Sequence, residues 1–139
     1  MIRGGIICII SLIYLLAAIE KLLNVELLKQ SLAASQLVPH QFIGAASAAV
    51  LVMEVLIPLL LICRPSRKFG LLLVCLSSLG FWWFHTLMSA RGSVHLCACF
   101  GGFVLPNWAY FALNAFLFVS GVLLLRQNLK MESGPSPLD

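Results

Sequence analysis

The sequence predicts an all-α polytopic membrane protein, a bundle of four transmembrane helices, from two observations. Of the 139 residues, 61% are hydrophobic and only 10% are charged, and the mean hydropathy is +1.03, whereas a soluble domain carries about a quarter charged residues. The apolar residues also gather into four runs of about 20 residues, the length that crosses a bilayer as a helix. Because backbone groups in lipid must satisfy their own hydrogen bonds, we expect these runs to be helical.

The four spans are expected at residues 4–23, 42–63, 69–90 and 106–125. Residues 20–36 are mixed polar and apolar, and we expect them to extend the first helix near the membrane interface. The turn at 64–68 is basic, and Pro106 suits the first position of the fourth helix. We expect one domain, residues 1–130, followed by a disordered cytoplasmic tail, residues 131–139, which is rich in proline, glycine and serine.

The Lys and Arg residues predict the orientation of the helices. With both termini in the cytoplasm, the cytoplasmic side holds Arg3, Arg64, Arg67, Lys68, Arg126 and Lys130, and the other side holds Lys21, Lys29 and Arg91. Cytoplasmic loops carry the excess of Lys and Arg. We therefore expect a multi-pass protein of the bacterial inner membrane, with both termini cytoplasmic and residues 91–105 outside. Single basic residues at span ends also argue against nucleic-acid binding, despite the net charge of +4.

Two cysteines, Cys97 and Cys99, stand in this outer loop, in the sequence His-Leu-Cys-Ala-Cys-Phe-Gly-Gly. Thiols one residue apart cannot join distant parts of a fold, and a disulfide between them needs a turned backbone, because bridged Cα atoms lie roughly 4.4–6.8 Å apart. The glycines after Phe100 supply that freedom. Disulfides form and persist outside the cytoplasm. We predict that the pair carries out thiol–disulfide exchange, with Arg91 and His95 favouring the thiolate.

Two other interpretations of the loop stay open. The cysteines could be unreactive thiols in a connection. Alternatively, His95 could join them as a third soft ligand for copper(I) or zinc, although structural zinc takes four ligands and the loop has no second pair. The remaining cysteines lie in or at the ends of apolar runs, where a free thiol behaves as a small hydrophobe; they are Cys8, Cys63 and Cys75.

Four polar residues are expected to meet in a pocket beneath the loop: Lys21, Glu54, His85 and Asn114. A charged residue inside a span, such as Glu54, costs about 2.5–3.5 kcal/mol on insertion scales and points to a functional site. Counting along the helices at ~1.5 Å per residue places His85 and Asn114 in the outer half of the bilayer and Lys21 near its surface. The alternative is that Glu54 pairs with Lys21 or a hydroxyl only to fix helix packing, and that His85 is an interfacial histidine.

On these residues the chain resembles the MauE branch of the DoxX-like membrane proteins, small four-helix bundles associated with redox maturation. Cys97-Ala98-Cys99-Phe100-Gly101 matches the family's Cys-Gly-Cys-Phe-Gly loop between the third and fourth spans. Lys21 and Glu54 match a lysine at the outer end of the first span and a glutamate of the second. Ala98 stands in place of the usual glycine, and this alanine stiffens the turn. Ala18 stands where the family often has glycine.

The resemblance implies a role in making or supporting disulfide-rich periplasmic proteins, as in methylamine dehydrogenase maturation, alongside an extracytoplasmic thioredoxin-like partner. Broader DoxX relatives are linked to quinones, so a quinone is the cofactor that the resemblance admits, with Glu54, His85 and Asn114 lining its site. Phe100 and Gly101 would shape the cysteine turn. The alternatives are a non-enzymatic accessory or scaffold subunit of a partner complex, and a quinone-linked subunit of the DoxX type.

Overall fold

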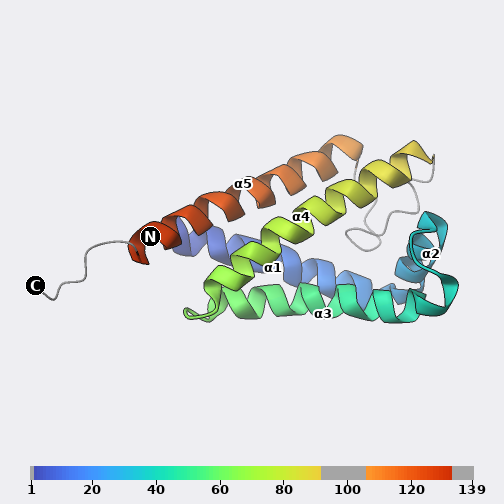
Figure 1. The fold of residues 1–139 in the computed structure, drawn as a ribbon, viewed down its shortest axis with the longest axis horizontal. Coiled ribbons are helices and arrows are strands. Elements are labelled where there is room, and N and C mark those ends of the chain that lie inside the picture. Colours follow the sequence, from blue (N-terminus) through green and yellow to red (C-terminus); the bar gives the residue numbers. More distant parts are fainter. Residues whose placement is uncertain (1, 92–105, 133–139) are drawn as a thin grey trace, which may run out of the picture.

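A computed structural model describes residues 2–91 and 106–132, and within these ranges the regular structure is entirely helical. The elements are α1 (Ile2–Leu23), α2 (Val25–Ser35), the short 3₁₀ helix η1 (His40–Phe42), α3 (Ile43–Ile62), α4 (Arg67–Ala90) and α5 (Asn107–Glu132). In this part of the chain, four helices are long and apolar enough to cross a membrane, at residues 4–23, 40–62, 67–90 and 108–129. Figure 1 shows them running along the long axis of the molecule, with α2 at one end. The predicted fold class is confirmed.

Two elements differ in extent from the sequence-based boundaries. The expected extension over residues 20–36 is a separate helix, because the chain turns at Asn24 between α1 and α2. The side-chain amide of Asn24 donates to the backbone carbonyl and the carboxylate of Glu20, at 3.2 and 2.8 Å. The last helix continues beyond residue 125 to Glu132, so the first two residues of the expected disordered tail are helical. Residues 133–139 lie outside the described residues.

Apolar and polar contacts divide the bundle into two halves. The core of fully buried apolar side chains lies towards the α3–α4 turn, where α4 packs along α5 and α1 along α3; it includes Ile10, Ile57, Leu61, Leu71, Val74 and Leu117. Most buried polar side chains lie at mid-depth or towards α2; they include Lys21, Ser31, Ser35, Glu54, His85 and Asn114. The bundle is therefore packed as an apolar core in one half and around polar groups in the other.

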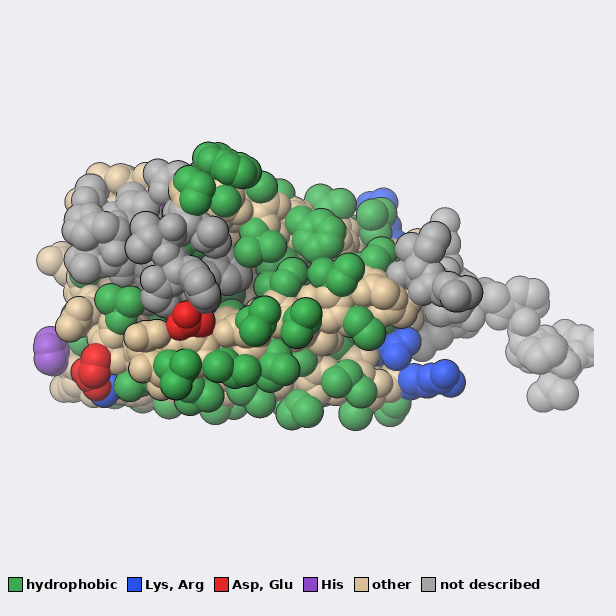
Figure 2. Space-filling view, turned by 180° about the vertical axis from the view of Figure 1, so that it is seen from behind, with side chains coloured by type: hydrophobic (Ala, Val, Ile, Leu, Met, Phe, Trp, Pro, Cys, Tyr) green, Lys and Arg blue, Asp and Glu red, His purple; other side chains and the backbone are tan. Residues whose placement is uncertain are grey.

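The outer surface of the helices is apolar along most of its length. Side chains with more than half of their area exposed include Leu12, Leu16, Val52, Leu59, Leu76 and Trp83. Figure 2 shows this apolar surface with Lys and Arg side chains gathered mainly at one end. That end holds the N-terminus, the α3–α4 turn and the C-terminal end of α5 (Figure 1). Such a surface fits a bundle immersed in a lipid bilayer.

Gly70 marks the close crossing of α3 and α4. A Cβ at this position would lie 3.1 Å from Leu60 Cβ and from the backbone nitrogen of Leu61. Backbone atoms of a packed helix cannot move away cheaply, and overpacking typically costs 1–3 kcal/mol. We expect Gly70→Leu to lower the free energy of unfolding by about this amount or more, measured by denaturation in detergent. Gly80→Leu on the same helix should fold normally, because a Cβ there meets nothing within 4 Å.

Candidate functional site

Lys21 and Glu54 form a buried ion pair that joins α1 to α3. Lys21 is in the last turn of α1, and its ammonium nitrogen donates to Glu54 Oε1. The two side chains are 1% and 0% exposed. The ammonium nitrogen also lies 5.2 Å from the centre of the Phe81 ring on α4, within the range of a cation–π contact. The pairing that sequence analysis considered is therefore present, and it connects three of the four transmembrane helices.

One oxygen of this pair is left unsatisfied. Glu54 Oε2 is buried and has no hydrogen-bond partner in the described part of the chain. A buried carboxylate accepts several hydrogen bonds when it is fully satisfied, and a buried acceptor without one is costly. The ion pair is therefore a place where a further polar group would be stabilising.

A second buried contact joins α1 to α4 and was not foreseen from the sequence. Tyr14 Oη and Ser77 Oγ share a hydrogen bond of 2.5 Å, and the hydroxyls of Ser77 and Ser78 donate to the backbone carbonyl of Val74 at 3.1 and 2.8 Å. A tyrosine in the middle of an apolar span is the signal that could have revealed it, because a buried Tyr hydroxyl usually has a partner. The contact fixes α4 against α1 below Lys21.

His85 and Asn114 lie together between α4 and α5. They are 2% and 3% exposed. The His85 ring is 5.1 Å from the Tyr110 ring and 5.0 Å from the Phe111 ring, and Asn114 donates to the backbone carbonyl of Tyr110 at 2.9 Å. Neither His85 nitrogen nor Asn114 Oδ1 has a hydrogen-bond partner in the described part of the chain. The histidine is thus buried against α5.

The contacts of the four expected pocket residues therefore lie at two different helix interfaces. Lys21 and Glu54 lie between α1 and α3, and His85 and Asn114 lie around Tyr110 between α4 and α5. The sequence predicts Lys21 near the membrane surface and Glu54 at mid-depth or somewhat outside it, with His85 and Asn114 in the outer half. It does not tell which helices face each other.

Arg91 ends α4 and holds it to α2. Its guanidinium donates to the backbone carbonyl of Ser35, the last residue of α2. The remaining residues predicted for the loop lie outside the described residues; they are His95, Cys97, Cys99, Phe100 and Gly101. The predicted effect of Arg91 and His95 on a thiolate stays a prediction.

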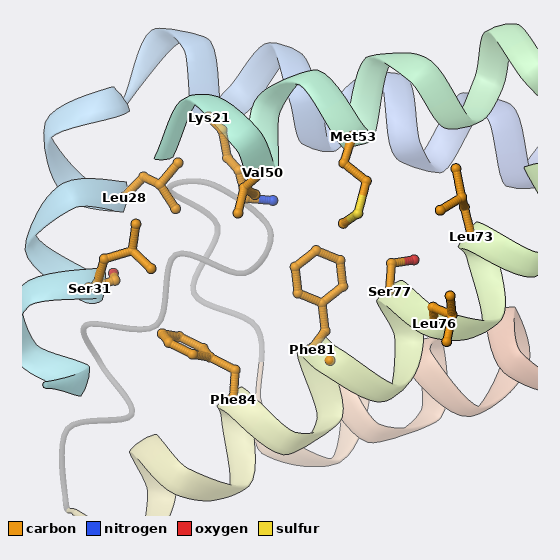
Figure 3. Close-up of a pocket in the computed structure, with 12 residues that line it drawn as sticks. Lys21, Leu28, Ser31, Val50, Met53, Leu73, Leu76, Ser77, Phe81 and Phe84 are labelled. Carbon is orange, nitrogen blue, oxygen red and sulfur yellow. The ribbon is translucent and has the colours of Figure 1, made fainter. Parts of the chain in front are cut away.

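A cavity of about 350 Å³ lies beside the ion pair. Its described lining comes from four helices, α1 through Lys21, α2 through Leu28 and Ser31, and both α3 and α4. Figure 3 shows Met53 of α3 and Phe81 of α4 pointing toward one another across it. Sequence analysis did not predict this cavity, because it depends on how α3 and α4 separate beyond their crossing.

The comparisons with known proteins bear on the whole bundle. The model of the family described as methylamine utilisation protein MauE matches residues 2–127, a range that contains the ion pair, both cysteines and most of α5. No curated protein and no solved structure matches the chain. With a match that covers most of its length and four helices suited to a membrane, the chain belongs to the MauE family of methylamine utilisation proteins.

Proposed function

We propose that this MauE-family protein supports thiol–disulfide chemistry of extracytoplasmic proteins in methylamine utilisation, through Cys97 and Cys99. The observation that supports the proposal is where the two flanking helices end. α4 ends at Ala90 and α5 begins at Asn107, both at the end of the bundle opposite the basic α3–α4 turn (Figure 1), and the two cysteines lie between these residues in the sequence. With both termini in the cytoplasm, that end faces the oxidising side of the membrane.

The exchange itself conserves electrons between the two proteins. A thiolate of a thioredoxin-like partner attacks the Cys97–Cys99 disulfide, and the sulfur that leaves takes up a proton. The second thiol of the partner then attacks the mixed disulfide. The partner ends with a disulfide, and Cys97 and Cys99 end as two thiols. The reverse sequence would reduce the partner, and the relative reduction potentials decide the direction.

A quinone, the cofactor that the resemblance to DoxX-like proteins admits, would accept two electrons and two protons from such a dithiol within the membrane. Of the groups predicted to line its site, Glu54 is paired with Lys21 beside the apolar cavity. His85 and Asn114 lie on the α4–α5 interface. The cavity has the apolar and aromatic lining that a quinone ring requires, so the residues present fit this group.

A non-enzymatic accessory role is the second candidate. The buried ion pair supports it, because Lys21, Glu54 and Phe81 link three helices and could serve only to fix their packing. In that case the cysteines would be part of a contact surface for a partner complex. The two candidates differ in whether the thiols react.

Cysteine labelling tests the side and the reactivity of the pair together. In a variant that retains only Cys97 and Cys99, we expect a membrane-impermeant maleimide to label intact spheroplasts after mild reduction and much less before it. A variant that retains only Cys63, which is exposed at the α3–α4 end, is the control and should be labelled only after permeabilisation. Labelling of the reduced pair only after permeabilisation would overturn the orientation. Full labelling without reductant would contradict a resting disulfide.

A further inference from the structure

We propose that the cavity beside Lys21 binds a membrane-dissolved amphiphile, with an oxygen-bearing head at Lys21 and an apolar body extending along α4 toward Leu73. The proposal rests on the cavity and not on the cysteines. It therefore stands or falls separately from the thiol chemistry proposed above.

The lining of the cavity sets the chemical class of the ligand. Among the described residues that line it, eight have apolar or aromatic side chains, and the others are Gly80 and the polar residues Lys21, Ser31 and Ser77. Its volume of about 350 Å³ falls within the roughly 300–1,000 Å³ of small-molecule sites, which combine such an apolar lining with a few polar groups. The ligand is therefore largely hydrocarbon.

Two of the three polar residues that line the cavity, Lys21 and Ser31, lie toward one end of it, and Ser77 lies nearer the other. Figure 3 shows Lys21, Leu28 and Ser31 toward one end of the cavity and Leu73 and Leu76 toward the other. The first end is formed by the end of α1 and by α2. A molecule lying along the cavity would thus place a polar head at the α2 end of the bundle and its apolar body toward the middle of the membrane.

The mouth of the cavity lies at the depth of the lipid chains. Gly80 and Leu76 line the cavity and are also exposed on α4. Gly80 lies ~20 Å from Arg67 and ~15 Å from Ala90, the two ends of α4, at 1.5 Å per residue. This is mid-depth for a helix that spans the bilayer. A ligand entering beside Gly80 comes from the hydrocarbon region and not from water.

The ion pair selects a head with oxygen. Lys21 lines the cavity, and its ammonium is shared with Glu54 beneath the Phe81 ring. Hydrogen bonds to charged groups are stronger than those between neutral groups, and the ion pair is buried from water that would compete. A carbonyl oxygen at the end of an apolar body fits this position. Acyl esters of lipids and ring carbonyls of isoprenoid quinones share that chemistry.

Gly80 provides a variant that closes the cavity without disturbing the fold. A Cβ there meets nothing within 4 Å, so the backbone of α4 has room for a side chain, and we expect that of Gly80→Leu to occupy the mouth. Leucine is also a better helix former than glycine. Gly44→Leu is the matched control, because Gly44 is equally unobstructed but does not line the cavity.

The test uses the full chain in nanodiscs that contain a phosphatidylcholine with a photoreactive diazirine in its acyl chain. We expect crosslinks, mapped by peptide mass spectrometry, at Met53 and Phe84 as well as on the outer helix faces. Gly80→Leu should reduce the cavity crosslinks at least tenfold and leave those on the outer faces unchanged. Gly44→Leu should change neither. Equal cavity crosslinking in Gly80→Leu, or none in the unsubstituted protein, would overturn the proposal.

Competition identifies the source of the ligand. An excess of decylubiquinone that removes the cavity crosslinks shows that a ring carbonyl occupies the site. Removal only by excess unlabelled phosphatidylcholine shows that a lipid ester does, and both results support the site. The double variant Cys97→Ser with Cys99→Ser should retain the crosslinks, because none of the described residues that line the cavity is a cysteine.

Discussion

Replacing Lys21 alone with methionine is expected to remove most of the folded protein, whereas replacing Lys21 and Glu54 together is expected to restore it. In Lys21→Met the carboxylate of Glu54 stays buried without its cation, and breaking one side of such a pair costs about 3–5 kcal/mol. In the double variant Lys21→Met with Glu54→Leu, both charges are gone. Replacement of a buried pair by apolar residues of similar volume is often neutral or stabilising.

The measurement is the free energy of unfolding in mixed detergent micelles, with folded yield as a second readout. Lys29→Met is the matched control, because Lys29 and Glu26 form a 2.7 Å pair on α2 whose side chains are 39% and 74% exposed. Exposed pairs contribute about 0–1 kcal/mol, so this control should fold nearly normally. Equal effects of Lys21→Met and Lys29→Met would show that the buried pair contributes no more to the free energy of unfolding than the exposed pair does.

The double variant also separates the two roles considered for Glu54. If it folds but fails to support maturation of periplasmic partners, the pair serves a function beyond packing. If it folds and works, the pair only fixes the helices. An ionisable residue inside a membrane span points to a functional site. The double variant tests this for Glu54, because activity is compared at an equal amount of folded protein.

The sequence was sufficient to predict the four helices, and it offered the pairing of Lys21 with Glu54 as one alternative, beside a hydroxyl partner. The helices follow from composition, since a long apolar run in lipid has no other way to satisfy its backbone. The partner of Glu54 could not be chosen from the sequence, because a buried carboxylate is stabilised by a hydroxyl as well as by a cation such as Lys21. The structure confirms the helices and shows the pairing with Lys21.

Depth alone could not predict how the helices turn toward each other. The contacts that the structure gives His85 and Asn114 are with Tyr110 and Phe111 of α5, and their meeting with Glu54 in one pocket stays a prediction. The direction of a side chain around a helix depends on packing partners, which a single sequence does not specify. The cavity was missed for a related reason: it forms where α3 and α4 diverge from their close crossing at Gly70, and no sequence pattern marks empty space.

The break between α1 and α2 at Asn24 could not be predicted from the composition of the segment. Residues 20–36 have a helical composition throughout, and α2 does form there. Asn24 interrupts the helix by bonding back to Glu20, a competition with helical hydrogen bonds that favours asparagine at helix ends. A break of one residue does not change the composition of a window, although it redirects α2 across the end of the bundle.

Cys97→Ser and Cys99→Ser are each expected to abolish maturation of a disulfide-bonded periplasmic partner as completely as the double variant. The reason is that exchange passes through a mixed disulfide that the second thiol must resolve, so either thiol alone is useless for turnover. The loss should exceed tenfold and be measured as the yield of correctly oxidised partner in cells. Cys63→Ser, which removes an exposed thiol at the opposite end of the bundle, is the control and should retain full activity.

One single variant, the one that keeps the attacking thiol, should also accumulate a covalent adduct, because its thiolate opens the disulfide of the partner and the missing second thiol cannot resolve the product. That adduct appears on a non-reducing gel and disappears when reductant is added, because the bond holding it is the unresolved mixed disulfide. A metal site would give a different pattern: no adduct, a graded loss, sensitivity to chelators, and His95→Ala behaving like the cysteine variants. Full activity of the double cysteine variant would remove both chemical interpretations and leave the bundle as an accessory to its partner complex.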